Sequence, residues 1–233
     1  MKAAIVTGAS SGIGLEICRV LLRKNYKVYG FGREFTKTDI REDNFHPVIC
    51  DVTNLPELSS KSIEIAAKEE IHILVNNAGV GYFGPHEELN PKKLHNMVAT
   101  NLEAPMILTQ LILRQLKKNA GYIFNISSVT ASKTNTHGCA YGATKAGLTS
   151  FSNSLFEEVR KYGVKVITIH PDMTKTNFYR NADFCEGESS DTYITPEEVG
   201  KAVEFILDQR EGIVISDITI KPQKHKITRK TGN

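Results

Sequence analysis

The sequence predicts an α/β fold in which helices cover both faces of a doubly wound parallel sheet of about seven strands. Short apolar runs alternate with longer helical patterns along the whole chain, which implies right-handed crossovers between parallel strands. The runs are nearly continuous in apolar character, as is typical of strands that are covered on both faces. Because no linker interrupts the alternation, we expect residues 1–233 to form a single domain.

The expected elements follow one another in strict alternation for most of the chain. The apolar runs predict strands at residues 3–7, 27–31, 46–50, 71–75, 121–126, 164–170 and 213–220. The helical patterns predict helices at residues 12–24, 55–68, 91–118, 141–161 and 196–209. Two helix starts carry further signals. Asn90 precedes Pro91, which suits the first helical position, and Thr195 opens a capping box with Glu198.

The longest stretch without a predicted helix or strand runs from residue 172 to residue 195 and is rich in polar and acidic residues. Irregular segments of this length in compact domains are often lids or binding loops. We therefore expect this segment to border the substrate rather than to be a surface insertion. The basic tail at residues 221–233 is expected to be a solvated terminus rather than a site for an anionic partner.

Composition excludes several classes of function. The 233 residues are 40% hydrophobic and 24% charged, with a mild net charge of +3. No aromatic residues interleave with the lysines of the tail, so we expect no nucleic-acid binding. The apolar run at residues 3–6 is too short for a signal peptide or a membrane span. The cysteines and histidines are scattered, which indicates no metal site and free thiols in a reducing cytoplasm.

A glycine-rich turn follows the first predicted strand, in the sequence T-G-A-S-S-G-I-G at residues 7–14. Glycines allow a tight turn and let backbone N–H groups approach a pyrophosphate at the start of a helix. The spacing is G-x-x-x-G-x-G rather than G-x-G-x-x-G, but its place in the first strand–helix unit is typical of a nucleotide site. The residues expected to contact the nucleotide are Gly8, Ser10, Ser11, Gly12, Ile13 and Gly14.

The end of the second predicted strand indicates which nucleotide is bound. An acidic residue there usually holds the ribose 2′-hydroxyl of NAD, whereas an arginine suits the 2′-phosphate of NADP. Gly32 occupies the usual acidic position and Arg33 follows it, which favours NADP(H). Glu34 keeps NAD(H) possible, because a shift of two residues would put a carboxylate near the ribose.

Tyr141 and Lys145 are four residues apart in a predicted helix and therefore share one face of it. A lysine ammonium beside a phenol favours the phenolate, so the pair is a candidate proton donor and acceptor. Tyrosine titrates near pH ~10, and action near neutrality requires a pKa lower by about three units, or roughly 4 kcal/mol. Lysine alone in water does not achieve this, but a lysine and an oxidised nicotinamide in a partly dry pocket can.

These motifs occur together with others in one order along the chain. They are the turn at residues 7–14, Asp51, the sequence N-N-A-G at residues 76–79, Asn101, Ser128, and Tyr141 with Lys145. In this order and at this spacing they resemble the short-chain dehydrogenase/reductase family, whose fold is Rossmann-like. The resemblance covers nearly the whole chain.

The resemblance implies a role for each residue of the catalytic group. Tyr141 would exchange a proton with the substrate oxygen, and Ser128 would hydrogen-bond that oxygen and stabilise its developing charge. Lys145 would bind the nicotinamide ribose and lower the pKa of the tyrosine. Asn101 would hold a water that relays protons to Lys145. Ser127 is an alternative to Ser128, but Ser128 has the family's usual spacing to Tyr141.

The resemblance also implies further cofactor contacts, and it includes one departure. The contacts would come from Asp51, Val52, Asn77, Ala78, Gly79, Tyr141, Lys145, Pro171, Thr174 and Thr176. The family usually has Pro-Gly after the sixth strand, where this chain has Pro171-Asp172. Aspartate tolerates unusual backbone angles less well than glycine and adds a carboxylate near the nicotinamide. It leaves the backbone unchanged, shifts the pocket, or selects a cationic or hydroxyl-bearing substrate.

The expected activity is NADP(H)-dependent hydride transfer between a carbonyl (ketone, aldehyde or 3-oxoacyl) and its alcohol, in a cytoplasmic homodimer or homotetramer. The alternative is a regulatory protein that binds NADP(H) and turns nothing over. An epimerase or dehydratase of the extended branch would have a longer chain. The substrate stays open. The aromatic residues Phe178, Tyr179 and Phe184 suit an apolar substrate, or they fasten their loop to the body of the protein.

Overall fold

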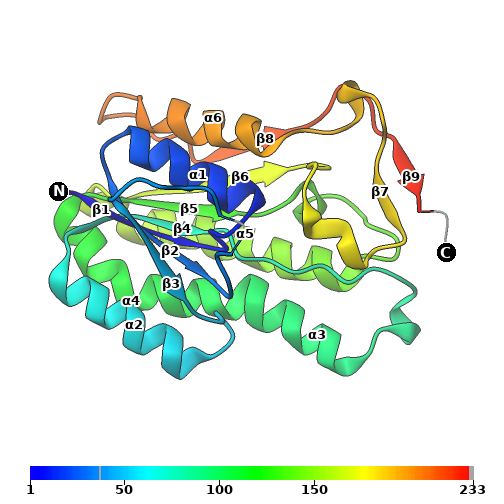
Figure 1. The fold of residues 1–233 in the computed structure, drawn as a ribbon, viewed down its shortest axis with the longest axis horizontal. Helices are drawn as coiled ribbons and strands as arrows, with labels where there is room; N and C mark the ends of the chain where they lie inside the picture. Colours follow the sequence, from blue (N-terminus) through cyan, green and yellow to red (C-terminus); the bar gives the residue numbers. More distant parts are fainter. Residues whose placement is uncertain (37, 231–233) are drawn as a thin grey trace.

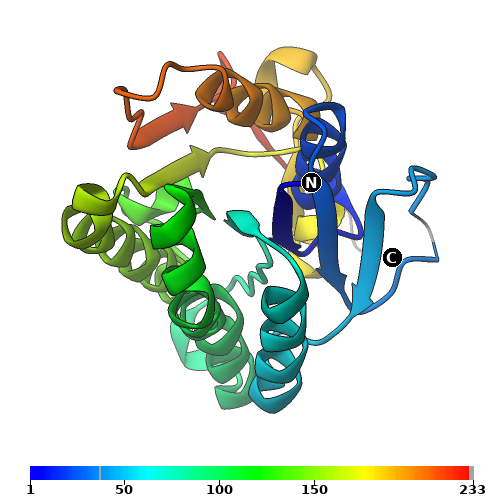
Figure 2. The same ribbon diagram turned by 90° about the vertical axis from the view of Figure 1, so that its left-hand side faces the viewer.

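The computed structural model describes residues 1–36 and 38–230 and contains a seven-stranded sheet in which every neighbouring pair is parallel. The strand order is β3-β2-β1-β4-β5-β6-β8 (Figures 1 and 2). The strands are β1 (Ala3–Thr7), β2 (Lys27–Gly32), β3 (Phe45–Ile49), β4 (Ile71–Asn76), β5 (Tyr122–Ile126), β6 (Lys165–Pro171) and β8 (Asp217–Ile220). The predicted doubly wound parallel sheet is confirmed.

Helices cover the sheet on both faces, as Figure 1 shows. One face carries α1 (Gly12–Arg23) and α6 (Pro196–Leu207), and the other carries α2 (Leu55–Lys68), α4 (Ala104–Asn119) and α5 (Cys139–Val159). Each layer has its own apolar core, because residues that alternate along the strands point to opposite faces. Ile5 packs in the core beneath α2 and α4, and its neighbour Val6 packs beneath α1 and α6.

The predicted helix at residues 91–118 is divided in the structure. It consists of α3 (Pro91–Val98), a π-helical turn η2 (Ala99–Glu103) and α4. Pro105 has no N–H to donate to the carbonyl of Asn101, four residues earlier, and its ring crowds that carbonyl. The wider π turn accommodates this mismatch. The predicted strand at residues 213–220 is also shorter, since β8 begins at Asp217.

The remaining helices are single short turns. They are η1 (His86–Glu88), η3 (Val129–Ala131), η4 (Arg160–Tyr162), η5 (Asn177–Asn181) and η6 (Ser190–Thr192). None of the helices within residues 1–36 and 38–230 is long and apolar enough to cross a membrane.

The segment at residues 172–195 and the basic tail lie side by side at one end of the molecule (Figure 1). β7 (Phe184–Glu186), within the segment, pairs antiparallel with β9 (Ile227–Arg229), within the tail. The Lys230 side chain donates to the Tyr179 carbonyl at 2.6 Å, and Lys224 forms an ion pair with Asp191. Residues 224–230 are mostly exposed, and the structure adds that Ile227–Arg229 pair with β7. The pairing joins residues distant in sequence, and local patterns do not reveal it.

The strand order reverses between β1 and β4, since the chain runs outward from β1 through β2 and β3 and then returns to β4. Connections on the two sides of this point lead in opposite directions and leave a crevice at the carboxyl ends of the strands. The glycine-rich turn follows β1, and the N-N-A-G segment follows β4. The topology therefore brings these two motifs together.

The close approach at Gly14 provides a test of this arrangement. A methyl group on Gly14 would lie 2.2 Å from the Gly8 carbonyl oxygen and 2.4 Å from the Asn77 side-chain nitrogen. Both neighbours are held in place, so we expect Gly14→Ala to lower the free energy of unfolding by about 2 kcal/mol through overpacking. Urea unfolding followed by circular dichroism measures this change.

Gly147→Ala is the matched control, because Gly147 lies inside α5 and its added methyl group would meet only the Leu102 side chain, at 3.2 Å. Alanine favours a helix over glycine by up to about 1 kcal/mol, so this variant is expected to be as stable as the native chain or more so. Equal stabilities for the Gly14 variant and the native chain would contradict the rigid contact.

Candidate active site

The glycine-rich turn is held against the end of β4 by a compact set of hydrogen bonds. The Thr7 hydroxyl accepts the backbone N–H groups of Asn77 and Ala78, each at 3.0 Å. The Asn77 side chain donates to the carbonyls of Thr7 and Gly8 at 3.0 and 3.2 Å. Gly8 has a φ of +65°, a left-handed conformation that glycine adopts without strain. The turn is thus shaped by residues from two adjacent strands.

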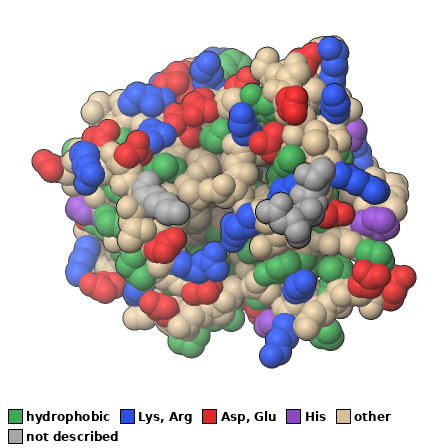
Figure 3. All heavy atoms as spheres, turned by 45° about the vertical axis from the view of Figure 1, so that its right-hand side comes forward, with side chains coloured by type: hydrophobic (Ala, Val, Ile, Leu, Met, Phe, Trp, Pro, Cys, Tyr) green, Lys and Arg blue, Asp and Glu red, His purple; other side chains and the backbone are tan. Residues whose placement is uncertain are grey.

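A cleft opens above the carboxyl ends of the strands. Figure 3 shows this face, where a recess floored by backbone and uncharged side chains (tan) is bordered by charged side chains. The predicted residues that line the cleft are Gly8, Ser10, Ser11, Gly12, Ile13, Arg33, Asp51, Val52, Asn77, Ala78, Gly79, Ser128, Tyr141, Lys145, Pro171, Thr174 and Thr176. Gly14 and Asn101 are not in this lining. Gly14 packs behind Gly8, and Asn101 is fully buried.

The end of β2 presents Arg33 to the cleft. Arg33 is exposed and lines the cleft, whereas Glu34 is exposed without lining it. Across residues 1–36 and 38–230, no acidic side chain lies within ion-pairing distance of the Arg33 guanidinium. Its hydrogen-bond donors are therefore available to an anionic group in the cleft. Gly32 leaves room here for the ring of Phe35, which would lie 3.0 Å from an added methyl group.

Tyr141, Lys145 and Ser128 converge on the floor of the cleft and are each less than a tenth exposed. Tyr141 and Lys145 come from the first turns of α5, and Ser128 follows β5. The Lys145 ammonium lies 5.8 Å from the centroid of the Tyr141 ring and donates to the Ile126 carbonyl at 2.8 Å. The predicted helical spacing therefore does place the phenol and the ammonium on one face.

Burial is the main cause of the pKa shifts of both Tyr141 and Lys145. It raises the pKa of the Tyr141 phenol above its ordinary value, and a hydrogen bond with the Ser128 side chain acts in the opposite direction. Burial also lowers the pKa of Lys145 to about 8. The protein's own groups thus favour the neutral phenol. A positive charge in the cleft would be needed to stabilise the phenolate.

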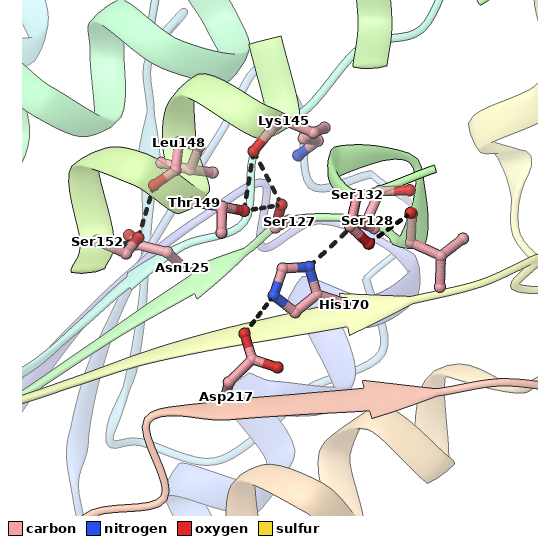
Figure 4. A network of polar contacts seen from close by, with 11 residues as sticks. Asn125, Ser127, Ser128, Ser132, Lys145, Leu148, Thr149, Ser152, His170 and Asp217 are labelled. Carbon is pink, nitrogen blue, oxygen red and sulfur yellow. Dashed lines mark hydrogen bonds and ion pairs between the residues drawn. The ribbon is translucent and has the colours of Figure 1, made fainter. Parts of the chain in front are cut away.

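The two candidate serines differ in where their hydroxyl groups point. The Ser127 hydroxyl bonds to the Lys145 carbonyl at 3.1 Å and to the Thr149 hydroxyl at 2.9 Å, and so lies against α5 (Figure 4). The Ser128 hydroxyl accepts the Thr130 N–H at 3.2 Å and lies near the Tyr141 phenol in the lining of the cleft. Ser128 is therefore the serine placed to meet a group bound at Tyr141, and Ser127 supports the helix.

Asn101 ties the π turn to the rest of the site. Its side-chain oxygen accepts the Val80 N–H, and its side-chain nitrogen donates to the Val80 carbonyl, both at 2.9 Å. The same nitrogen donates to the Thr144 hydroxyl at 3.1 Å, which in turn donates to the Tyr141 carbonyl at 2.8 Å. The amide thus joins the chain after β4 to the helix that carries the tyrosine.

Asp172 replaces the usual glycine without backbone strain. Within the described residues, the only non-glycine positions with positive φ are Asn25, Ala120 and His137. The Asp172 N–H donates to the Ile220 carbonyl, and its carboxylate accepts the Met173 N–H, both at 2.9 Å. The backbone at Asp172 therefore has ordinary angles, and the residue lies in the lining of the cleft.

Aromatic rings surround Tyr141 on the side facing segment 172–195. Phe83, Phe178, Tyr179 and Phe184 form one cluster with Tyr141, and their ring centroids lie 5.2 to 6.0 Å apart. Such spacings are typical of attractive aromatic pairs. The cluster both fastens the segment to the body of the protein and makes the space beside the phenol apolar.

The sequence interpretation placed Phe178 and Tyr179 beside the substrate or against the body of the protein, and both line the cleft. It missed Arg180, which also lines the cleft, and Phe83, which belongs to the aromatic cluster. No motif surrounds either residue in the sequence, and only the place of Arg180 in the long loop could have indicated it. No group of three or more His, Cys, Asp or Glu side chains suited to a metal ion occurs in the part of the chain that the structure describes.

Comparisons with known proteins agree with this geometry. A family model described as short chain dehydrogenase matches residues 2–184. An uncharacterized oxidoreductase of Staphylococcus haemolyticus is 30% identical over 230 residues, which cover 95% of this chain and 97% of that relative. The serine 3-dehydrogenase of Agrobacterium fabrum is 29% identical over 231 residues, covering 94% and 92%.

Among solved structures, the closed form of a serine dehydrogenase complexed with NADP+ matches with a TM-score of 0.84 and 28% identity, covering 94% of each chain. The family model spans most of this chain, and the staphylococcal relative spans nearly all of it. The chain therefore belongs to the short-chain dehydrogenase family of oxidoreductases.

Proposed function

We propose that this protein is an NADP(H)-dependent oxidoreductase that interconverts a carbonyl and the corresponding alcohol, with Tyr141 as the general acid and base. The observation that carries the proposal is the convergence of Ser128, Tyr141 and Lys145 on the floor of the cleft that begins at the glycine-rich turn. A bound nicotinamide would supply or accept the hydride. The protein's own side chains would transfer the proton and hold the substrate and the cofactor.

Proton transfer is assigned to Tyr141. During reduction its phenol donates a proton to the carbonyl oxygen, while the Ser128 hydroxyl hydrogen-bonds the same oxygen and stabilises its negative charge. During oxidation the steps reverse. The neutral phenol that burial favours is the form that reduction requires. For oxidation, the charge of the oxidised nicotinamide would stabilise the phenolate.

Lys145 and Asn101 support this proton transfer. The Lys145 ammonium lies close to the Tyr141 ring and faces Gly79 on the cleft wall. It would bind the nicotinamide ribose and lower the tyrosine pKa once that ribose is in place. Since Pro105 cannot donate to the Asn101 carbonyl, this carbonyl is suited to hold the water of a proton relay.

We assign the choice of cofactor to Arg33, which favours NADP(H) over NAD(H). Its guanidinium lines the cleft, and a planar fork of donors suits the 2′-phosphate. Arg180, which lines the same cleft, adds a second cation. The NADP+ complex of the related serine dehydrogenase supports this choice. NAD(H) stays the alternative and would depend on Glu34.

The substrate class is assigned from the aromatic cluster. Two rings beside Tyr141, Phe83 and Phe178, and the cluster behind them favour a substrate with an apolar group next to its carbonyl over a small zwitterion such as serine. Substrate specificity of the serine 3-dehydrogenase relatives is therefore not carried over. A cytoplasmic location and a homodimer or homotetramer complete the proposal, which the four free thiols and the family's usual assembly support.

Cofactor selectivity is the first test. Loss of charge-assisted hydrogen bonds to the 2′-phosphate lowers affinity by about 1.5 to 3 kcal/mol, so Arg33→Ala should weaken NADPH binding roughly tenfold or more. NADH affinity should stay the same. Fluorescence titration with each cofactor measures both affinities. Arg41→Ala is the control, because this exposed arginine follows the same strand without lining the cleft. Tighter binding of NADH than of NADPH by the native protein would sink the NADP assignment.

Removal of the phenol hydroxyl tests the chemistry. General acid catalysis contributes roughly 10²- to 10⁴-fold, and Tyr141→Phe should lower kcat by that factor on a substrate found with a panel of apolar ketones and aldehydes. NADPH affinity should change much less than kcat, because the other cofactor contacts stay in place. Tyr162→Phe, at an exposed tyrosine, is the control. A native protein that binds NADPH but reduces nothing in the panel would favour the regulatory alternative.

The buried ammonium predicts a dependence of stability on pH. The Lys145 pKa is about 8 in the folded protein and about 10.4 in an unfolded chain. Between these values the unfolded state binds more protons, so this group makes the fold more stable as pH rises. Relative to Lys145→Met, the native chain should gain about 2 kcal/mol between about pH 7 and about pH 9.5. Urea unfolding at each pH measures the difference, and parallel profiles would refute it.

A further inference from the structure

A buried histidine lies directly beneath the loop that carries Ser128. His170, on β6, has its Nδ1 atom 3.1 Å from the Ser128 carbonyl oxygen and its Nε2 atom 2.7 Å from a carboxylate oxygen of Asp217, on β8 (Figure 4). The histidine side chain is 7% exposed, and the aspartate side chain is 54% exposed. Asp217, His170 and the Ser128 carbonyl thus form a row of polar groups that runs from the surface to the backbone of the proposed catalytic serine.

The chemistry of the two partners determines what the ring does. A backbone carbonyl can only accept a hydrogen bond, and an ionised carboxylate can only accept one. Both distances are those of hydrogen bonds, so an Nδ1–H group can donate to the Ser128 carbonyl while Asp217 holds the ring at Nε2.

The Ser128 carbonyl is already one fixed point of the loop. It accepts the Ala131 N–H at 3.0 Å, which closes the turn η3. His170 occupies the second lone pair of the same oxygen. On the other side, the Ser127 N–H donates to the Ile169 carbonyl at 2.8 Å. The backbone on either side of Ser128 is thus held from β6, which fixes the place from which the Ser128 side chain extends.

We propose that His170, oriented by Asp217, is a positioning residue that holds the Ser128 hydroxyl against Tyr141. The inference rests on the proposed function, because it assigns His170 a share of the catalytic step through Ser128. His170 itself touches neither Tyr141 nor Lys145, and the residues that line the cleft do not include it. Its loss is therefore expected to lower kcat while leaving the affinity for NADPH unchanged.

Two near-isosteric substitutions separate positioning from packing. In His170→Asn the side-chain nitrogen takes the place of Nδ1 and can still donate to Ser128. In His170→Gln the amide reaches only as far as Nε2 and can donate only toward Asp217. The glutamine variant is expected to lose kcat roughly tenfold, and the asparagine variant to stay within about twofold of the native enzyme.

The measurements are kcat, KM and the NADPH dissociation constant, with melting temperatures to show that each variant is folded. An equal loss of kcat in both variants would mean that the imidazole only fills space, and an unchanged kcat in the glutamine variant would mean that Ser128 needs no support. Either result overturns the proposal.

Asp217 provides an independent check at an exposed side chain. Asp217→Asn can donate from its amide to Nε2 and so keep Nδ1–H directed at Ser128, and its kcat should stay within about twofold of the native value. Asp217→Leu removes the partner of Nε2 and should lower kcat several-fold. The same kcat in both variants would contradict the orienting role of Asp217.

Two readouts need no substrate and separate this inference from the proposed function. Nitrogen NMR of histidine-labelled protein, with the His170 signal identified by its absence in His170→Gln, should show a proton on Nδ1 at neutral pH. A ring whose Nδ1 carries no proton would overturn the inference. If no carbonyl compound reacts, the proposed function fails, and the crystal structure of His170→Gln then decides the inference. A displaced Ser128 hydroxyl supports it, and an unmoved one refutes it.

Discussion

The structure depends on the contact between the carboxyl ends of β1 and β4. Thr7 and Asn77 bond across this contact, and Gly14 lets the start of α1 approach without a side chain in between. The contact works because two parallel strands end side by side where the strand order reverses. It places the residues of the turn in the lining of the cleft, so the nucleotide end of the site follows from the topology of the sheet.

The part of the site that holds Tyr141 and Lys145 depends on the burial of these side chains. Tyr141 and Lys145 are nearly inaccessible to water, and both pKa values move toward the neutral forms. A site built in this way responds strongly to any charge that enters it, since a dry environment screens charges poorly. The aromatic cluster strengthens this effect by excluding water from the side of the phenol that faces segment 172–195.

Segment 172–195 contacts the rest of the protein on two sides. Thr176 packs against Gly12 on the nucleotide side, and β7 pairs with β9 on the far side. The tail is therefore joined to segment 172–195, which borders the proposed substrate. Antiparallel pairing between two short strands is marginal alone, and the ion pair of Lys224 with Asp191 adds to it.

The sequence by itself determined the parallel sheet, the order of motifs along it and the helical spacing of Tyr141 and Lys145, because periodicity and short-range spacing are local properties. The pattern predicted one unbroken helix at residues 91–118, which the π turn η2 before Pro105 divides in the structure. Only the tertiary structure bonded the Ser127 hydroxyl to α5, paired β7 with β9, and set His170 between Ser128 and Asp217. These outcomes join residues tens of positions apart, and hydrogen-bond direction and desolvation exist only once the strands have packed.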